Sequence, residues 1–230
     1  MVGLTHVLIP GAGSDASYWH ALAPLLRERG HDVVTLDLPC DDDRAGLPEY
    51  VDTVVEAIGE RRDIVVVAQS MAGFTAPLVC KRVPVRQIVL LNAMIPLPGE
   101  TPGEWWGATG QEAARREMDL REGRDPEAPF DVHAYFLHDV PQEALEKLGE
   151  PRRQSDTPFG SPCTFEAWPD VPTHVIVGRD DRFFPAEFQR RVARDRLGVT
   201  ADEIPGGHLA ALSHPRELAD LLEQYAAQLG

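Results

Sequence analysis

The sequence has few cysteines, few basic residues and no long apolar run, and each shortage excludes a class of protein. Its three cysteines, Cys40, Cys80 and Cys163, lie far apart, so we expect neither a disulfide framework nor a zinc knuckle. Lys and Arg total 22 against 37 Asp and Glu, and the formal charge of −15 would repel nucleic acid and anionic lipid. No stretch approaches the roughly 18 apolar residues of a membrane span, and the first residues are unlike a signal peptide. We therefore expect a cytoplasmic protein that binds neither nucleic acid nor membranes.

The histidines also lack the spacing of a metal site. None of the 8 histidines belongs to an H-x-x-x-H or H-E-x-x-H motif. The acidic run at residues 41–43 lacks the ligand spacing of a calcium loop and fits a solvated turn. We expect no metal.

What the chain does contain is a regular alternation of strand-like and helix-like segments. Its 230 residues suffice for one domain with a sizeable core. Short apolar runs rich in β-branched residues alternate with segments of helical period, which predicts an α/β fold: a mostly parallel sheet of about six strands flanked by helices. The runs are residues 6–10, 32–38, 63–68, 87–91 and 173–177, with a weaker one within 198–204; apolar stripes predict helices around residues 51–58 and 218–229.

The alternation breaks over residues 96–170, which hold half of the 20 prolines and two candidate helices near 110–122 and 141–149. A structureless loop of this length is implausible in a compact domain. We therefore expect residues 1–95 and 171–230 to form the core and residues 96–170 to form a helical cap over the carboxyl edge of the sheet. Trp105 and Trp106 would either line a substrate pocket under this cap or pack the cap against the sheet.

The glycine-rich turn after the first strand allows two interpretations. Residues 11–16, GAGSDA, match G-x-G-x-x-A, and Asp37 follows at the end of the second strand, as in a dinucleotide-binding fingerprint. However, no Tyr is followed four residues later by Lys, so the catalytic pair of short-chain dehydrogenases is absent. The same flexible turn could instead direct a backbone N–H at a developing oxyanion.

The third strand leads directly into a sharp bend at Ser70. A serine on such a strand-to-helix elbow needs small residues two positions before and after it, and here these are Ala68 and Ala72. Glycine is usual at both positions, so the signal is weaker than a full G-x-S-x-G. Pro77 falls inside the helix expected after Ser70, where we expect a kink.

Two later loops supply the partners of a serine nucleophile. The strand at residues 173–177 leads to Asp180 and Asp181, and the last strand leads to His208. Serine, acid and histidine thus each follow the carboxyl end of a parallel strand, in the chain order of α/β-hydrolase triads.

With these motifs the sequence resembles the α/β-hydrolases, and within them the branch of plant methyl esterases and hydroxynitrile lyases with their bacterial relatives. The matching stretches are residues 10–19, 69–73, 181–189 and 206–215, with a lid-like segment at 136–143 and 152–155. Pro10, which stands in place of the usual His, and the two alanines around Ser70 depart from the family pattern.

The resemblance implies a role for individual residues. Ser70 would be the nucleophile, His208 the general base and then acid, and Asp181 the carboxylate that orients the imidazole. Asp180 competes for the third role, and Asp181 is preferred because it stands four residues before Pro185, as in the family. The backbone N–H groups of Ala12 and Met71 would form the oxyanion hole.

The resemblance also separates esterases from lyases. The lyases of this branch typically carry Thr or Asn where this sequence has Gly11, and one class has Lys after the catalytic His, where this sequence has Leu209. We therefore expect a cofactor-independent serine hydrolase of the carboxylesterase type, which cleaves a small, largely apolar ester through an acyl-enzyme on Ser70. The alternatives are a non-catalytic small-molecule binder or receptor, lyase-like C–C cleavage and, third, a nucleotide-binding oxidoreductase. The partner would be a small-molecule substrate, and a homodimer stays open.

Overall fold

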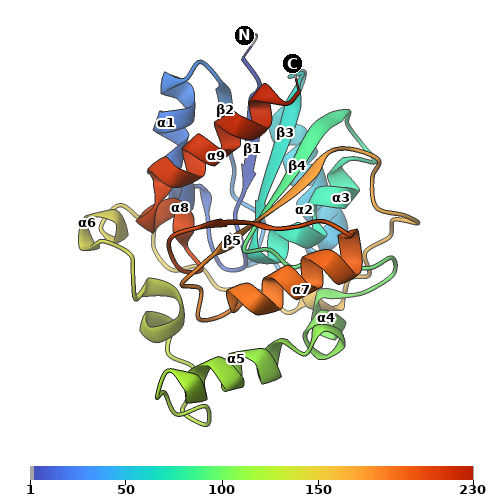
Figure 1. Ribbon diagram of the computed structural model, residues 1–230. Helices are drawn as coiled ribbons and strands as arrows, with labels where there is room; N and C mark the ends of the chain where they lie inside the picture. The colour runs from blue at the N-terminus through green and yellow to red at the C-terminus, as the bar shows by residue number, and fades with distance from the viewer. Residues whose placement is uncertain (1–2, 230) are drawn as a thin grey trace.

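The computed structural model describes residues 3–229 and contains one six-stranded sheet (Figure 1). The strand order is β2-β1-β3-β4-β5-β6, and every neighbouring pair is parallel. The strands are β1 (Thr5–Ile9), β2 (Asp32–Thr35), β3 (Ile64–Gln69), β4 (Val85–Leu91), β5 (Thr173–Gly178) and β6 (Asp202–Ile204). The prediction of an α/β fold with about six parallel strands is confirmed.

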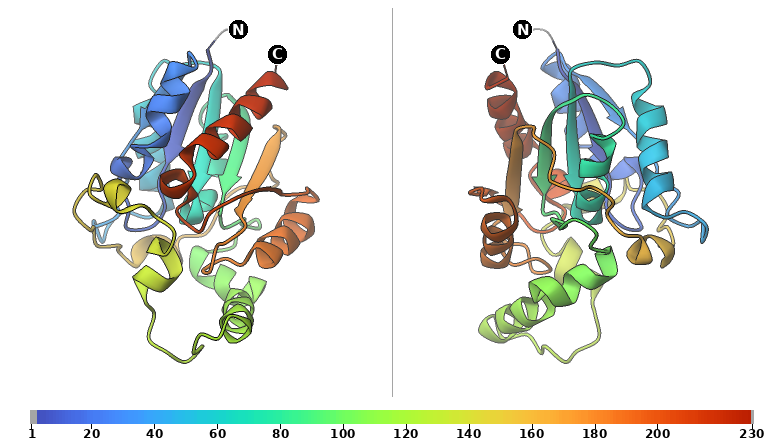
Figure 2. Two further views of the ribbon diagram at one scale, coloured as in Figure 1. Left: turned by 60° about the vertical axis from the view of Figure 1, so that its left-hand side comes forward. Right: turned by 90° about the vertical axis from the view of Figure 1, so that its right-hand side faces the viewer.

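Helices cover both faces of the sheet, because the side chains of each strand alternate between two apolar layers. Val65 and Val67 of β3 pack with α1 (Leu22–Glu28), α8 (Ala210–Ser213) and α9 (Pro215–Ala227). On the other face, Val66 and Ala68 pack with α2 (Leu47–Ile58), α3 (Ala76–Val79) and α7 (Ala186–Leu197). Figures 1 and 2 show α9 crossing in front of the strands beside α1. Both predicted helical stripes, on α2 and α9, are buried against the sheet.

Four local predictions were wrong. β2 ends at Thr35, because the following residues leave the sheet before position 38. The segment after Ser70 is a 3-10 turn, Ser70–Phe74, followed by the short α3. Pro77 is the second residue of α3, where a backbone N–H would have no partner within the helix. Pro77 therefore does not kink α3. The helix expected at 141–149 shrinks to α6 (Gln142–Leu145).

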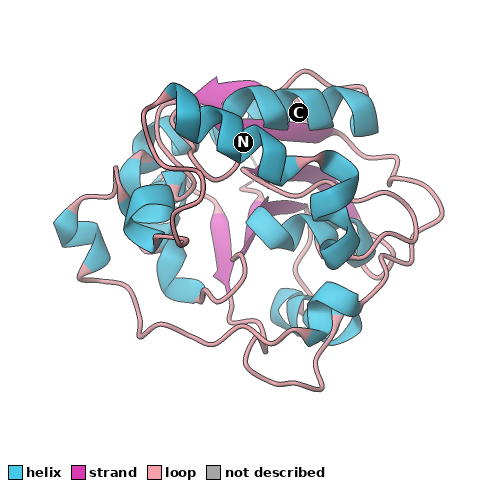
Figure 3. Cartoon of the chain, turned by 90° about the horizontal axis from the view of Figure 1, so that it is seen from below, coloured by secondary structure: helices cyan, strands magenta, loops and turns pink. Residues whose placement is uncertain are grey.

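The segment between β4 and β5 gathers at the carboxyl edge of the sheet, and we name residues 96–170 the cap segment. It contains α4 (Pro102–Thr109), α5 (Gln111–Arg121), a π-helical turn (His133–Leu137), α6 and a 3-10 turn (Thr157–Gly160). Figure 1 shows α4 and α5 below the sheet and α6 to its left, and the view from below shows helices and long loops across that edge (Figure 3).

Short backbone hydrogen bonds join the two ends of the cap segment. The Gly99 N–H donates to the Cys163 carbonyl at 2.8 Å, and the Cys163 N–H donates to the Glu100 carbonyl at 2.9 Å. Helix α4 was not predicted, although Thr101 and Glu104 form a capping box around it. Among residues 3–229, no helix has the length and apolar character needed to cross a bilayer.

Candidate active site

Ser70 occupies a strained bend directly after β3. Its φ of 54° lies in the left-handed region, which non-glycine residues rarely adopt and which is typical of a nucleophile elbow. Ala68 and Ala72 are buried, so their methyl groups fit at the elbow. The tightest position is Gly73, where an added Cβ would lie 1.8 Å from the Met94 carbonyl oxygen. The backbone therefore demands glycine three residues after Ser70, a requirement that the sequence motif did not reveal.

The structure brings Ser70, His208 and Asp181 into one hydrogen-bonded chain. The distance between Ser70 Oγ and His208 Nε2 is 3.0 Å, and that between His208 Nδ1 and Asp181 Oδ2 is 2.8 Å. Asp181 is fully buried and His208 is 2% exposed. With Asp181 ionised, Nδ1–H donates to the carboxylate and Nε2 is left to accept the Ser70 hydroxyl proton.

Asp181 is held in this orientation by three further donors. Its Oδ1 accepts from the backbone N–H groups of Phe183 and Phe184, each at 2.8 Å, and its Oδ2 accepts from Gln189 Nε2 at 3.3 Å. These donors compensate the burial of the charge and leave Oδ2 directed at His208.

Asp180 faces away from His208. Its side chain is 47% exposed and pairs with Arg179 at 3.2 Å. Burial acts to raise the pKa of Asp180, but hydrogen bonds from Arg179 and the Gly206 N–H outweigh it, and the pKa lies below its ordinary value. Of the two acids in this loop, the structure thus brings only Asp181 to the imidazole.

Carboxamide side chains tie the loops of the acid and the histidine together. Asn92, which follows β4 with a φ of 45°, accepts from the Gly178 N–H at 2.6 Å. Its amide group donates to the carbonyls of Gly207 and His208 at 3.0 and 3.2 Å. Gln69 Nε2 also donates to the His208 carbonyl, at 3.3 Å. Sequence analysis missed both residues, although a polar residue directly after an apolar strand was the available signal.

Aromatic side chains exclude water from the imidazole of His208. Phe136 of the cap segment stacks on it with ring centroids 5.1 Å apart, and Phe183 and Phe184 approach edge-on at 5.2 and 5.0 Å. In such an apolar environment the hydrogen bonds of His208 are stronger than they would be in water.

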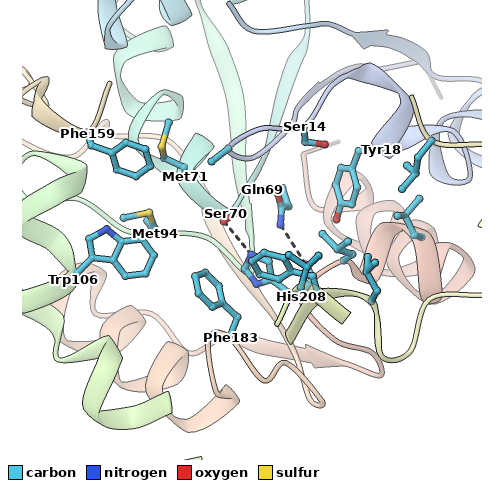
Figure 4. Close-up of a pocket in the computed structure, with 17 residues that line it drawn as sticks. Ser14, Tyr18, Gln69, Ser70, Met71, Met94, Trp106, Phe159, Phe183 and His208 are labelled. Carbon is cyan, nitrogen blue, oxygen red and sulfur yellow. Dashed lines mark hydrogen bonds between the residues drawn. The ribbon is translucent and has the colours of Figure 1, made fainter. Parts of the chain in front are cut away.

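Ser70 and His208 open into a cavity of about 340 Å³ between the sheet edge and the cap segment (Figure 4). Most of its lining is apolar, with Met94, Trp106, Phe159 and Phe183 among the larger side chains. A cavity of this size and character suits a small organic molecule.

Two backbone N–H groups are available beside Ser70. Ala12 and Met71 both line the cavity, and among residues 3–229 neither N–H donates to another protein group. The adjoining turn is fixed by the cap segment, since the Gly13 N–H donates to Gln154 Oε1 at 2.9 Å. A Cβ at Gly11 would lie 2.2 Å from Gln69 Oε1 and 2.9 Å from the Cβ of Ser70, so position 11 has no room for a side chain.

The groups that would bind a dinucleotide instead form hydrogen bonds within the protein. Asp37, the candidate ribose ligand, accepts from the Ala16 N–H at 2.8 Å. The Gly13 N–H, a candidate phosphate ligand, is the one bound to Gln154. Both groups therefore serve the turn itself.

Comparison with known proteins agrees with this geometry. Residues 7–221 match the alpha/beta hydrolase family. The chain belongs to this family. It is 28% identical to a probable esterase, PIR7A, of Oryza sativa, over 98% of both chains. It is 26% identical to a pyrethroid hydrolase of Sphingobium wenxiniae, over 96% of this chain and 86% of that protein.

The fold is similar to that of a solved esterase structure. The crystal structure of polyneuridine aldehyde esterase superposes with a TM-score of 0.78 over 97% of this chain and 99% of that chain, at 22% identity. The expected membership of the α/β-hydrolases is confirmed, and the chain is related to plant esterases and a bacterial pyrethroid hydrolase, as the resemblance implied.

The two adjacent tryptophans of the cap segment have different surroundings. Trp105 is fully buried, donates from Nε1 to the Ile95 carbonyl at 3.1 Å and does not line the cavity. Of the two expected alternatives, Trp105 therefore takes the packing role, because its ring packs α4 against Phe184 and Phe188. Trp106 turns the other way and lines the cavity.

Proposed function

We propose that this hydrolase is a serine carboxylesterase that cleaves a small, largely apolar ester. The hydrogen-bonded chain from Ser70 through His208 to Asp181, at the wall of an apolar cavity, carries this proposal. Esterases and hydrolases among its distant relatives support the same reaction class.

In the first half of the proposed reaction, Ser70 Oγ attacks the ester carbonyl carbon while its proton passes to His208 Nε2. The carbonyl oxygen becomes an oxyanion, which the N–H groups of Ala12 and Met71 stabilise by about 3 to 4 kcal/mol each. Asp181 stabilises the imidazolium. When the tetrahedral intermediate collapses, the C–O bond to the alcohol breaks, and His208 returns the proton to the departing alcohol oxygen.

In the second half, water takes the place of the alcohol. His208 Nε2 removes a proton from the water as its oxygen attacks the acyl carbon, and the same oxyanion site is used again. Collapse releases the carboxylic acid and returns the proton to Ser70 Oγ.

The alternatives receive less support from the same residues. A lyase of the resembling branch would need a side-chain donor at position 11, where a Cβ has no room beside Gln69, and Leu209 offers no cation to a leaving cyanide. For a non-catalytic binder there is no reason to keep Ser70 in a strained backbone conformation.

A set of p-nitrophenyl esters of graded acyl length tests the proposal, together with mass spectrometry after a fluorophosphonate probe. We expect turnover and labelling of Ser70, and a loss of about 10⁴-fold or more in rate for Ser70→Ala. If the wild-type protein neither labels nor hydrolyses any ester, the serine hydrolase proposal fails. Labelling with slow turnover of every ester would keep the nucleophile and reject the substrate class.

A further inference from the structure

The two sides of the cavity differ in chemistry. Figure 4 shows Met94, Trp106 and Phe159 to one side of Ser70, and Ser14 and Tyr18 to the other. The first group offers only apolar surface apart from one indole. The second consists of two residues that carry hydroxyl groups, Ser14 and the buried Tyr18.

The Tyr18 hydroxyl is a buried donor without an acceptor. Tyr18 is 2% exposed, and within residues 3–229 its hydroxyl proton has no acceptor. Burial raises the pKa of Tyr18, the Ala211 N–H opposes the shift, and the carboxylates of Asp181 and Asp139 add to it, so the phenol keeps its proton. The Ala211 N–H can only donate to the oxygen, so the phenolic proton still lacks an acceptor.

An unpaired buried hydroxyl costs about 1 to 3 kcal/mol. Several other buried polar atoms lack a partner within the described chain, but of these groups Tyr18 alone lines the cavity. An acceptor on a bound molecule would remove the cost.

We propose that Tyr18 forms a second subsite that donates a hydrogen bond to a neutral oxygen of the substrate, such as an ether, ketone or hydroxyl oxygen. The inference rests on the proposed esterase function and narrows its substrate class to oxygenated apolar esters. The ester carbonyl lies at Ser70, an apolar group packs near Trp106, and the oxygen lies on the opposite side. Leu209 and Leu212 also line the cavity, and their apolar surroundings disfavour a charged group in place of a neutral oxygen.

Matched ester pairs that exchange one methylene for oxygen test this subsite. 2-Naphthyl butanoate and methoxyacetate vary the acyl side, and butyl and 2-methoxyethyl 2-naphthoate vary the alcohol side. For each pair, the ratio of kcat/KM for the oxygen ester to that for the methylene ester is compared between wild type and Tyr18→Phe, which cancels intrinsic reactivity. In one pair we expect Tyr18→Phe to lower this ratio about three- to tenfold, as one hydrogen bond would.

Tyr225→Phe is the matched control, because the Tyr225 hydroxyl donates to Asp202 away from the cavity. We expect it to leave the ratios unchanged and to lower Tm. Tyr18→Phe removes a hydroxyl whose proton has no acceptor and whose oxygen receives only the Ala211 N–H, so its Tm should fall less than that of Tyr225→Phe. Unchanged ratios in both pairs for Tyr18→Phe, or a fall in Tm like that of Tyr225→Phe, would overturn the proposal.

Ester binding to the Ser70→Ala variant tests the subsite independently of the proposed esterase function. The same esters are titrated into Ser70→Ala and into the double variant that also carries Tyr18→Phe, and binding is followed by intrinsic tryptophan fluorescence. A three- to tenfold weaker Kd for an oxygen ester alone, about the size expected of one hydrogen bond, supports the subsite even if the wild-type protein hydrolyses nothing. Equal Kd changes for both members of each pair reject it even if esterase activity is found.

Discussion

The neighbouring acids Asp180 and Asp181 allow a sharp test of the proposed mechanism. In Asp181→Asn, the Phe183 and Phe184 N–H groups that bind Oδ1 would hold the amide oxygen in its place. The amide NH₂ must then occupy the position of Oδ2, 2.8 Å from His208 Nδ1. As a donor, it requires Nδ1 to be the acceptor, so the imidazole proton moves to Nε2.

A proton on Nε2 removes the acceptor that faces Ser70 at 3.0 Å. Loss of the tautomer in which Nε2 can act as the base lowers kcat about 10⁴-fold. This corresponds to between about 5 and 6 kcal/mol of transition-state stabilisation. In Asp180→Asn the amide oxygen can still accept from the Gly206 N–H, and only the exposed pair with Arg179 is lost. We expect a change below about threefold, because exposed ion pairs contribute little.

The measurement is kcat/KM on one p-nitrophenyl ester for wild type and both variants, with circular dichroism to verify the fold. An equal loss for the two asparagine variants, or more than about a tenth of the activity left in Asp181→Asn, would refute the tautomer argument.

Three further predictions use other parts of the molecule. Gly73→Ala places a Cβ 1.8 Å from the Met94 oxygen and should lower kcat/KM by about 100-fold or more, whereas Gly107→Ala, with open space around it, should keep full activity; equal effects would contradict the close-packing argument. Asp139→Ala removes the acceptor of the Gly207 N–H, 2.6 Å away, and should lower kcat about three- to tenfold while Asp139→Asn keeps most of it; a matching loss in both would reject this anchoring of the His208 loop. Burial and His31 lower the pKa of His6 to about 3. When the pH falls below the ordinary pKa of histidine, His6 therefore binds a proton in the unfolded chain but not in the folded chain. Stability should therefore fall as pH drops, by about 2 kcal/mol from about pH 7 to 5 for this group. Urea unfolding at both pH values should show that much less loss in His6→Gln, and an identical loss would disprove the assignment.

Much of the fold could be predicted because its signals are local. Apolar β-branched runs such as β3 form buried strands wherever helices cover both faces, and parallel strands align their carboxyl ends at one edge. Ser70 follows such a run and His208 follows the weaker last one, so their meeting could be expected from chain order. The short α6 and the 3-10 turn at Ser70–Phe74 were misjudged, because their ends depend on what the segment packs against.

The sequence by itself therefore determined the alternation of strands and helices and the order of serine, acid and histidine along the sheet edge. Only the tertiary structure decided which side chain of an adjacent pair points toward the site: Asp181 and not Asp180 meets the imidazole, and Trp106 and not Trp105 lines the cavity. It also revealed Tyr18 as a buried hydroxyl without an acceptor. Adjacent residues share the same local sequence, whereas their surroundings are set by contacts with segments far away along the chain, and a period or a motif does not encode those contacts.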